Sequence, residues 1–343
     1  MTKSTEAEFP FDSLPLDPTG PPGNAWGRFG KDDQLGTLNL LTPERVVEAA
    51  KEIRTGVRIS LDWPLSMPSH PSFNRDPFRQ EIVLRSPNCI FDDVLSFNSQ
   101  GSTQWDGFRH YANQRSKQFY NGHTVEEIQS SDVIGINSMC EHGGITGRGI
   151  LLDYADWATT NSISVSALQS ETITLEHIKQ VVQDHKLDFR KGDILFIRSG
   201  FTAAYNKLND QQRKDLALRS SPDFNGVEAT EAMVRWLWEH QFAAVAGDAP
   251  SFERAPIRGP TLTPTSICMS GSWEVLRVRQ MLSLFSELLR SIEIQHRMLS
   301  TQSYNSVNNI ILPYPPRQRH FVNVGRDLGD SPTWQRAAGR SRL

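Results

Sequence analysis

Three short apolar runs, separated by amphipathic segments, constrain most strongly what this chain can fold into. The apolar runs lie at 150–154, 193–198 and 242–246, and each has the length of a buried strand. The segments 175–185 and 228–241 show helical periodicity between them. This alternation predicts strands and helices mixed in one α/β layer architecture, and the chain contains no internal repeat or clean linker that would divide it.

Local signals add further elements. Thr42 followed by Pro43 predicts a helix that starts there and continues to Gly56, and Thr124 with Glu127 forms a capping-box pattern before a short helix. Residues 1–25 are rich in Pro and Gly, which predicts an extended arm. Runs rich in β-branched or aromatic residues predict strands at 57–63, 81–85 and 91–97.

The composition changes near residue 260. The chain carries 36 Lys and Arg against 39 Asp and Glu, a net charge of −3. Residues 260–343 contain ten Arg, five acidic residues and no Lys, so they hold +5 of charge against −8 for the preceding residues. Only 281–294 has good helical periodicity there. We therefore expect an arm at 1–25, a folded domain at 26–259 and a divergent C-terminal region at 260–343.

Several classes of function are disfavoured by these patterns. The mildly acidic total provides no electrostatic footprint for nucleic acid or an anionic membrane. Cys89, Cys140 and Cys268 are too far apart for a zinc-finger pattern or a secreted disulfide framework. The N-terminus lacks the apolar core of a signal peptide, and no run of 18 apolar residues occurs, so we expect a cytoplasmic protein without a membrane partner.

The densest group of reactive side chains lies between residues 97 and 110. Gln100, Gln104, Asp106 and His110 follow a predicted strand, and Asp106 stands four residues before His110. A helical turn would place these two side chains on one face, where they could share a metal or act as an oriented general base. A helix-capping Asp followed by a surface His is the simpler interpretation, and spacing alone leaves both open.

Four further residues are candidates for a substrate pocket. Asp248 and Ser251 follow the buried strand at 242–246, and sites of α/β proteins gather at such strand ends. His142 precedes two glycines in a loop that could line a pocket, although a surface loop histidine is the simpler interpretation. Trp105 lies between Gln104 and Asp106. The glycine-rich run at 144–149 lacks the lysine of a phosphate loop, and no G-x-S-x-G elbow occurs, so nucleotide binding and serine hydrolysis are both disfavoured.

The segment 97–110 resembles the signature H-x-G-T-H-x-D-x-x-x-H of the cyclase family, which includes bacterial-type kynurenine formamidases and isatin hydrolases. The blocks 26–56, 143–154, 191–201 and 226–253 are similar to other parts of the larger family members. The signature positions are occupied here by Gln100, Ser102, Thr103, Gln104, Asp106 and His110.

The resemblance implies a swivelling β/β/α fold in a single domain and metal-dependent hydrolysis of a small amide, formamide or lactone. It implies a divalent metal, zinc or manganese, near Asp106, Gln100 and Gln104, with Asp106 and His110 as catalytic residues and His110 moving the proton. It also implies a homodimer or a larger homo-oligomer. Because Gln replaces both leading His residues, harder ions such as Mg²⁺, Ca²⁺ or Mn²⁺ suit the site better than zinc. Two alternatives stay open: a tailoring cyclase or dehydratase of natural-product biosynthesis, and a non-catalytic relative.

The resemblance stops at residue 260. Family members continue with a His-containing helix and an I-G-E turn that supply further metal ligands, and neither is recognisable here. His296 and Glu293 are present, but their surroundings do not match. We therefore predict that the reading frame or splicing of the gene departs from the family near this point. Sequencing of the transcript would refute that prediction if it encodes residues 260–343 in frame.

Overall fold

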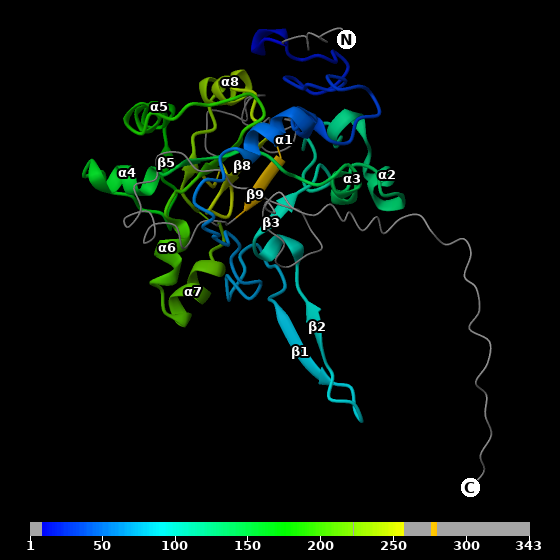
Figure 1. Ribbon diagram of the computed structural model, residues 1–343, viewed down its shortest axis with the longest axis vertical. Helices are drawn as coiled ribbons and strands as arrows, with labels where there is room; N and C mark the ends of the chain where they lie inside the picture. Colours follow the sequence, from blue (N-terminus) through cyan, green and yellow to red (C-terminus); the bar gives the residue numbers. More distant parts are fainter. Residues whose placement is uncertain (1–8, 222, 257–275, 280–343) are drawn as a thin grey trace, which may run out of the picture. The chain divides into compact units, whose positions relative to one another are not determined.

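A five-stranded sheet forms the centre of the structure, a computed structural model that describes residues 9–221, 223–256 and 276–279. The chain divides into two units, 1–310 and 311–343, and all described residues belong to the first. The strand order is β3-β9-β8-β6-β4, with β3 antiparallel to β9 and the other neighbours parallel (Figure 1). The strands are β3 (Gln104–Asp106), β4 (Gly149–Leu152), β6 (Ile194–Ile197), β8 (Ala244–Gly247) and β9 (Leu276–Arg279).

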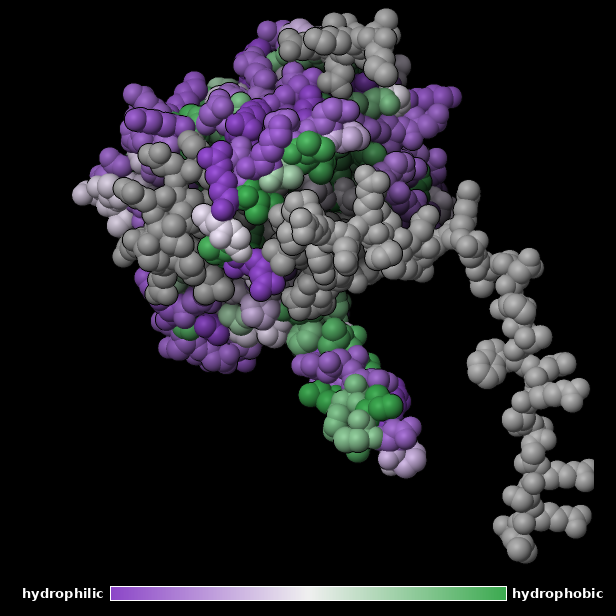
Figure 2. All heavy atoms as spheres, in the orientation of Figure 1, coloured by the Kyte–Doolittle hydropathy of each residue, from purple (hydrophilic) through white to green (hydrophobic). Residues whose placement is uncertain are grey.

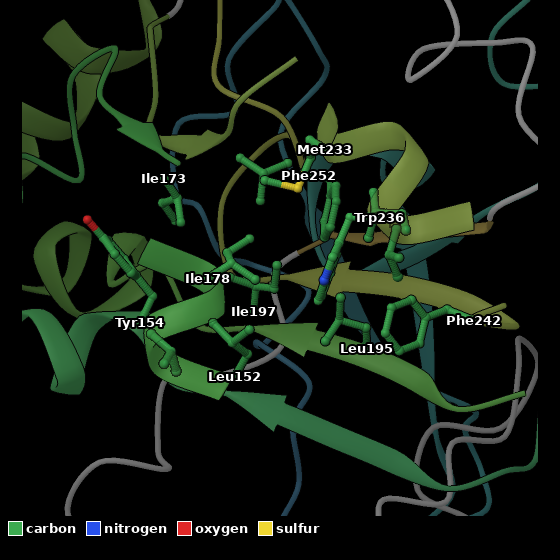
Figure 3. Packing of buried hydrophobic residues seen from close by; sticks show 14 of the residues in the cluster. Leu152, Tyr154, Ile173, Ile178, Leu195, Ile197, Met233, Trp236, Phe242 and Phe252 are labelled. Atoms are coloured by element: carbon green, nitrogen blue, oxygen red, sulfur yellow. The ribbon is translucent and has the colours of Figure 1, made fainter. Parts of the chain in front are cut away.

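Both faces of the central strands are buried, which is typical of parallel sheets. On one face, Leu195 and Ile197 pack against three helices, as Figure 3 shows. These helices are α4 (Tyr154–Thr160), α5 (Leu175–Asp184) and α8 (Glu231–Glu239). On the other face, Ile194 and Phe196 pack with residues of η2 (Gly36–Leu40) and α3 (Ile136–Glu141). The predicted α/β architecture is confirmed, because strands and helices alternate in layers around these runs.

Threonine side chains begin several helices. Thr42 accepts a hydrogen bond from the Arg45 backbone at the start of α1 (Pro43–Ala50), and Thr124 forms the predicted capping box of α2 (Val125–Ser130). Such caps satisfy backbone N–H groups that have no partner within the helix. Helix α1 ends before the predicted Gly56, because the N–H groups of residues 51–53 bond three residues back and tighten the chain out of the helix.

The predicted strands at 81–85 and 91–97 are confirmed as β1 (Arg79–Leu84) and β2 (Phe91–Ser96), which pair antiparallel. The predicted strand at 57–63 is wrong. Leu61 and Trp63 are buried in different hydrophobic clusters, and the Trp63 backbone N–H donates to the Thr103 hydroxyl at 2.9 Å. This segment therefore uses its apolar side chains to fill gaps between elements and does not pair as a strand.

The β1–β2 hairpin exposes apolar side chains on one of its faces. Ile82, Leu84, Phe91 and Leu95 alternate in register on that face, and each is between 42% and 65% exposed. The opposite face carries Arg79, Glu81 and Asp92, among others. Figure 2 shows the apolar side chains of the hairpin as green spheres at the surface.

Residues near the N-terminus and a segment beyond residue 260 both contribute to the described structure. The predicted N-terminal arm contacts α8: the Trp238 indole donates to the Phe9 carbonyl at 2.8 Å, and Arg235 pairs with Asp12 at 2.6 Å. In the region beyond 260, where we expected few packing elements, residues 276–279 form β9 between β8 and β3. The helix predicted at 281–294 lies outside the described residues. Among the helices that the structure describes, none combines the length and the apolarity needed to cross a bilayer.

Candidate functional site

The signature segment folds into a short turn and an edge strand. The Asn98 side chain accepts a hydrogen bond from the Gln100 backbone at 2.9 Å and thereby begins η3 (Ser99–Gly101), and β3 follows. Because side chains alternate along a strand, Gln104 and Asp106 share one face of β3 and Trp105 takes the other. Gln104 and Asp106 are buried, whereas Trp105 packs partly buried against the sheet core. Trp105 is therefore positioned as a packing residue of this edge.

Gln100, Gln104 and Asp106 form one hydrogen-bonded cluster, which we call the amide–carboxylate cluster. The Gln100 amide Nε2 donates to Asp106 Oδ1 at 2.5 Å, and Gln104 Nε2 donates to Gln100 Oε1 at 2.7 Å and to Asp106 Oδ1 at 3.2 Å. Gln104 Oε1 is buried and has no hydrogen-bond partner within the described part of the chain. A buried carbonyl oxygen without a hydrogen-bond donor destabilises the fold by about 1–3 kcal/mol, so a donor or a cation that binds this oxygen would be stabilising.

Arg75 lies beside this cluster. Its Nη1 donates to the Gln100 backbone carbonyl at 3.0 Å, and its guanidinium carbon stands 4.8 Å from the centre of the Phe73 ring. Burial lowers the pKa of Arg75, while the negative charge of Asp106 acts in the opposite direction. The site therefore contains one carboxylate and one partly desolvated guanidinium within electrostatic reach of each other.

A depression of about 370 Å³, including solvent at its open mouth, adjoins Gln100 and Arg75. Its walls are mainly apolar, and two of its polar side chains are already paired: the Tyr205 hydroxyl lies 3.4 Å from Ser69 Oγ, and His70 Nε2 lies 2.9 Å from Asp210 Oδ1. The lining residues are Pro68, His70, Pro71, Ser72, Phe73, Arg75, Gln100, Gly101, Phe201, Tyr205, Leu216 and Pro250. Such a concave, apolar site with few polar groups suits a small organic ligand.

His110 does not share a helical face with Asp106. Asp106 ends β3 and His110 lies in the turn that follows, where its backbone N–H bonds the Gly107 carbonyl at 3.0 Å. The helical-turn interpretation of this spacing is therefore wrong, because β3 is held in extended form by its pairing with β9. His142, in turn, is exposed at the end of α3, where its Nδ1 contacts the Ser138 carbonyl at 2.7 Å.

Asp248 and Ser251 have structural contacts. Asp248 is fully buried, and its two oxygens accept five hydrogen bonds from Ser199, Gly200 and Thr202, around the start of α6 (Phe201–Asn206). The Ser251 hydroxyl donates to the Glu253 carbonyl at 2.7 Å. Between these two residues, Pro250 lines the depression. The strand end thus reaches the wall of this depression through Pro250, and Ser251 lines a second, smaller depression of about 200 Å³ that includes open solvent.

Reasoning from the sequence missed Arg75, Phe201 and Tyr205. Arg75 lies in a loop with no periodic or capping signal, so nothing in its neighbourhood marks it. Phe201 and Tyr205 are four residues apart, a spacing that places both on one face of α6, but this segment shows no other sign of a cavity wall.

The donor chemistry suits a hard cation better than zinc. The cluster offers one carboxylate and two amide oxygens, and Gln104 Oε1 lacks a partner, so the residues fit a weakly held Mg²⁺- or Mn²⁺-type ion. Gln100 and Gln104 at present direct their N–H groups at Asp106, so their amides must turn to present oxygen. Within the described ranges, no group of three or more His, Cys, Asp and Glu side chains is placed to hold a metal.

The fold and the cluster define an α/β protein with a buried carboxylate at the edge of a mixed sheet. Residues 57–254 match the model of the family described as "Putative cyclase", and this chain therefore belongs to that cyclase family. The swivelling cyclase-type fold predicted from the sequence is confirmed by this membership and by the structures that resemble it.

One similar solved structure supports this assignment. A protein described as a novel cyclase is 28% identical, with a TM-score of 0.65, over 78% of this chain and 89% of that one. Isatin hydrolase A from Ralstonia solanacearum is 14% identical (TM-score 0.49; 71% and 86% covered), and a predicted metal-dependent hydrolase from Bacillus stearothermophilus is 13% identical (TM-score 0.35; 66% and 83% covered). A search of curated proteins found no match.

Proposed function

We propose that this chain is a hydrolase that opens a small amide, formamide or lactone at the amide–carboxylate cluster. The observation that carries the proposal is the convergence of Gln100, Gln104 and Asp106 at one edge of the sheet, beside a depression with mainly apolar walls that is open to solvent. These three residues also occupy the ligand positions of the family signature that the sequence resembles.

A hard divalent ion, when bound by Asp106, Gln100 and Gln104, would supply an acidified water and a polarised carbonyl. The protein's own residues have separate tasks in this proposal. Asp106 provides the only carboxylate of the cluster, the two amides would turn to add their oxygens as ligands, and His110 receives or relays the proton released by water. Burial of Asp106 and Gln104 limits competing bulk water.

Two experiments test this function. Purified protein is incubated with N-formyl-kynurenine, isatin and simple lactones in buffers that contain Mn²⁺, Mg²⁺ or Zn²⁺. We expect ring opening or deformylation of at least one compound, and a loss of about 10²-fold or more in kcat/KM for Asp106→Asn. Turnover that is unchanged in Asp106→Asn refutes the assignment, and Trp105→Phe, on the opposite face of β3, serves as the control for structural damage.

One observation favours the alternative of a non-catalytic relative. The two amide N–H groups already satisfy Asp106 Oδ1, so the carboxylate is stabilised without any cation. Elemental analysis separates the two functions: near-stoichiometric metal that is lost in Asp106→Ala supports the hydrolase. Bound metal without turnover of any of the compounds above supports instead a tailoring cyclase or dehydratase.

We also propose that the chain forms a homodimer or a larger homo-oligomer through the β1–β2 hairpin. An isolated two-stranded hairpin is marginally stable in water, and this one exposes Ile82, Leu84, Phe91 and Leu95 together. The only charged residue on that face, Asp93, accepts a hydrogen bond from Gln80 at 2.9 Å. When a second copy covers the face, Asp93 keeps this hydrogen-bond partner.

A further inference from the structure

We propose that Arg75 binds a carboxylate of the substrate and thereby selects small cyclic acids over neutral analogues. The inference rests on the proposed function, because it takes the depression beside the amide–carboxylate cluster as the substrate site. It adds a substrate class, an apolar ring that bears an anionic group, which neither the family assignment nor the cluster itself specifies.

The first observation is that the Arg75 guanidinium has unused hydrogen-bonding capacity. A guanidinium carries five N–H donors, and the described residues accept one hydrogen bond from Arg75, at the Gln100 carbonyl. No carboxylate of the described chain lies within 4.0 Å of it. By contrast, Arg148 pairs with Asp193 at 3.1 Å, and Arg198 pairs with Asp153 at 2.8 Å. These two arginines show how the same protein compensates buried positive charge elsewhere.

The second observation is that an anion in the depression can reach the Arg75 guanidinium and compensate its positive charge. Arg75 is itself part of the wall of the depression, so an oxyanion that enters there can accept two parallel hydrogen bonds from the guanidinium fork. Asp106 is the negative charge that Arg75 senses, but its Oδ1 is already occupied by the two amides. The guanidinium therefore lines the open depression and lies near a carboxylate whose Oδ1 is already hydrogen-bonded.

The third observation concerns the remaining walls. Pro71, Phe73, Phe201 and Leu216 are apolar, and the Phe73 ring already stacks under the guanidinium at 4.8 Å. His70, the other basic group in the wall, is held by Asp210 at 2.9 Å. A ligand that matches this lining combines a ring with one carboxylate, and the carboxylate orients the ring toward the cluster.

Binding of two matched probes tests the proposal without any turnover. Phenylacetate and its neutral isostere phenylacetamide are titrated into the full-length protein up to 10 mM, and binding is followed by ligand-detected NMR. We expect phenylacetate to bind about tenfold or more tightly than the amide. In Arg75→Met we expect that preference to disappear, whereas in Arg75→Lys a part of it remains, because lysine keeps the charge but loses the fork.

His70→Gln is the matched control, since it removes the other basic group of the wall and should keep the preference. Equal binding of both probes, binding of neither at 10 mM, or a preference that survives in Arg75→Met overturns the proposal, as does its loss in His70→Gln alone. If Arg75→Met does not fold, binding of both probes to the wild-type protein is measured again in 0.5 M NaCl. A preference for phenylacetate that salt does not weaken then overturns the proposal. The Asp106→Asn enzyme separates the two levels: turnover that is unchanged in this variant, together with an intact preference for phenylacetate, contradicts the hydrolase and leaves the anion site standing.

Discussion

Replacement of Asp248 distinguishes a structural carboxylate from a catalytic one. The sequence places this residue where α/β enzymes hold their reactive groups, but the structure surrounds it with donors. Asp248 Oδ1 accepts from the Ser199 backbone and hydroxyl at 2.6 and 2.7 Å. Oδ2 accepts from the backbones of Gly200 and Thr202 and from the Thr202 hydroxyl, at 3.1–3.3 Å. Asp248→Asn therefore replaces one acceptor oxygen by an NH₂ group that faces donors.

The cost of this substitution can be worked out from the contacts. The new amide is least unfavourable with its NH₂ toward Ser199, because the hydroxyl there can rotate and accept. One buried backbone N–H then loses its acceptor, at about 1–3 kcal/mol. Loss of the negative charge at the start of α6 adds about 0.3–1 kcal/mol. We expect the free energy of unfolding to fall by about 1–4 kcal/mol in Asp248→Asn, and by more in Asp248→Ala, which leaves three backbone N–H groups without an acceptor.

Urea unfolding followed by tryptophan fluorescence measures this change. Ser251→Ala is the matched control, because it removes a single hydroxyl bond at the same strand end and should cost less than about 1.5 kcal/mol. An Asp248→Asn protein with the wild-type unfolding midpoint would refute the structural assignment. If that protein also lost all turnover, Asp248 would be a catalytic group after all.

Three other substitutions give distinct outcomes. Burial raises the pKa of Asp193 to about 6, so protonation of this carboxyl stabilises the folded state, and that stabilisation is lost as the pH rises from about 4 to 6. In urea unfolding, the wild-type protein should lose up to about 3 kcal/mol of unfolding free energy relative to Asp193→Asn across this pH range. Unfolding free energies of the two proteins that change in parallel with pH would contradict this prediction. Arg198→Met leaves Asp153 buried without its partner and should lower the free energy of unfolding by about 3–5 kcal/mol, whereas a loss under 1 kcal/mol would show the pair to be dispensable. Phe91→Asp should shift the oligomer toward monomer in light scattering, and an unchanged mass, or a monomeric wild type, would argue against the hairpin interface.

Local patterns predicted much of the fold, and non-local pairing explains the main errors. The Thr42 and Thr124 caps and the three buried runs depend on neighbouring residues, so they can be read from the sequence. The position of His110 could not, because the extended form of the preceding residues depends on β9, which lies about 170 residues further along the chain. Arg75 was still harder to predict, because a loop residue acquires its role only when the fold brings its side chain to a cavity formed by distant segments.

The residues around Asp106 set the charge balance of the candidate site. Here the amides of Gln100 and Gln104 donate to Asp106, and Arg75 supplies a positive charge nearby. Without a metal, the guanidinium and the carboxylate together are neutral. A divalent ion would bring an excess of two positive charges, which a substrate carboxylate at Arg75 would partly offset. Cation and anionic substrate would then favour each other's binding, since such coupling between two ligands is reciprocal.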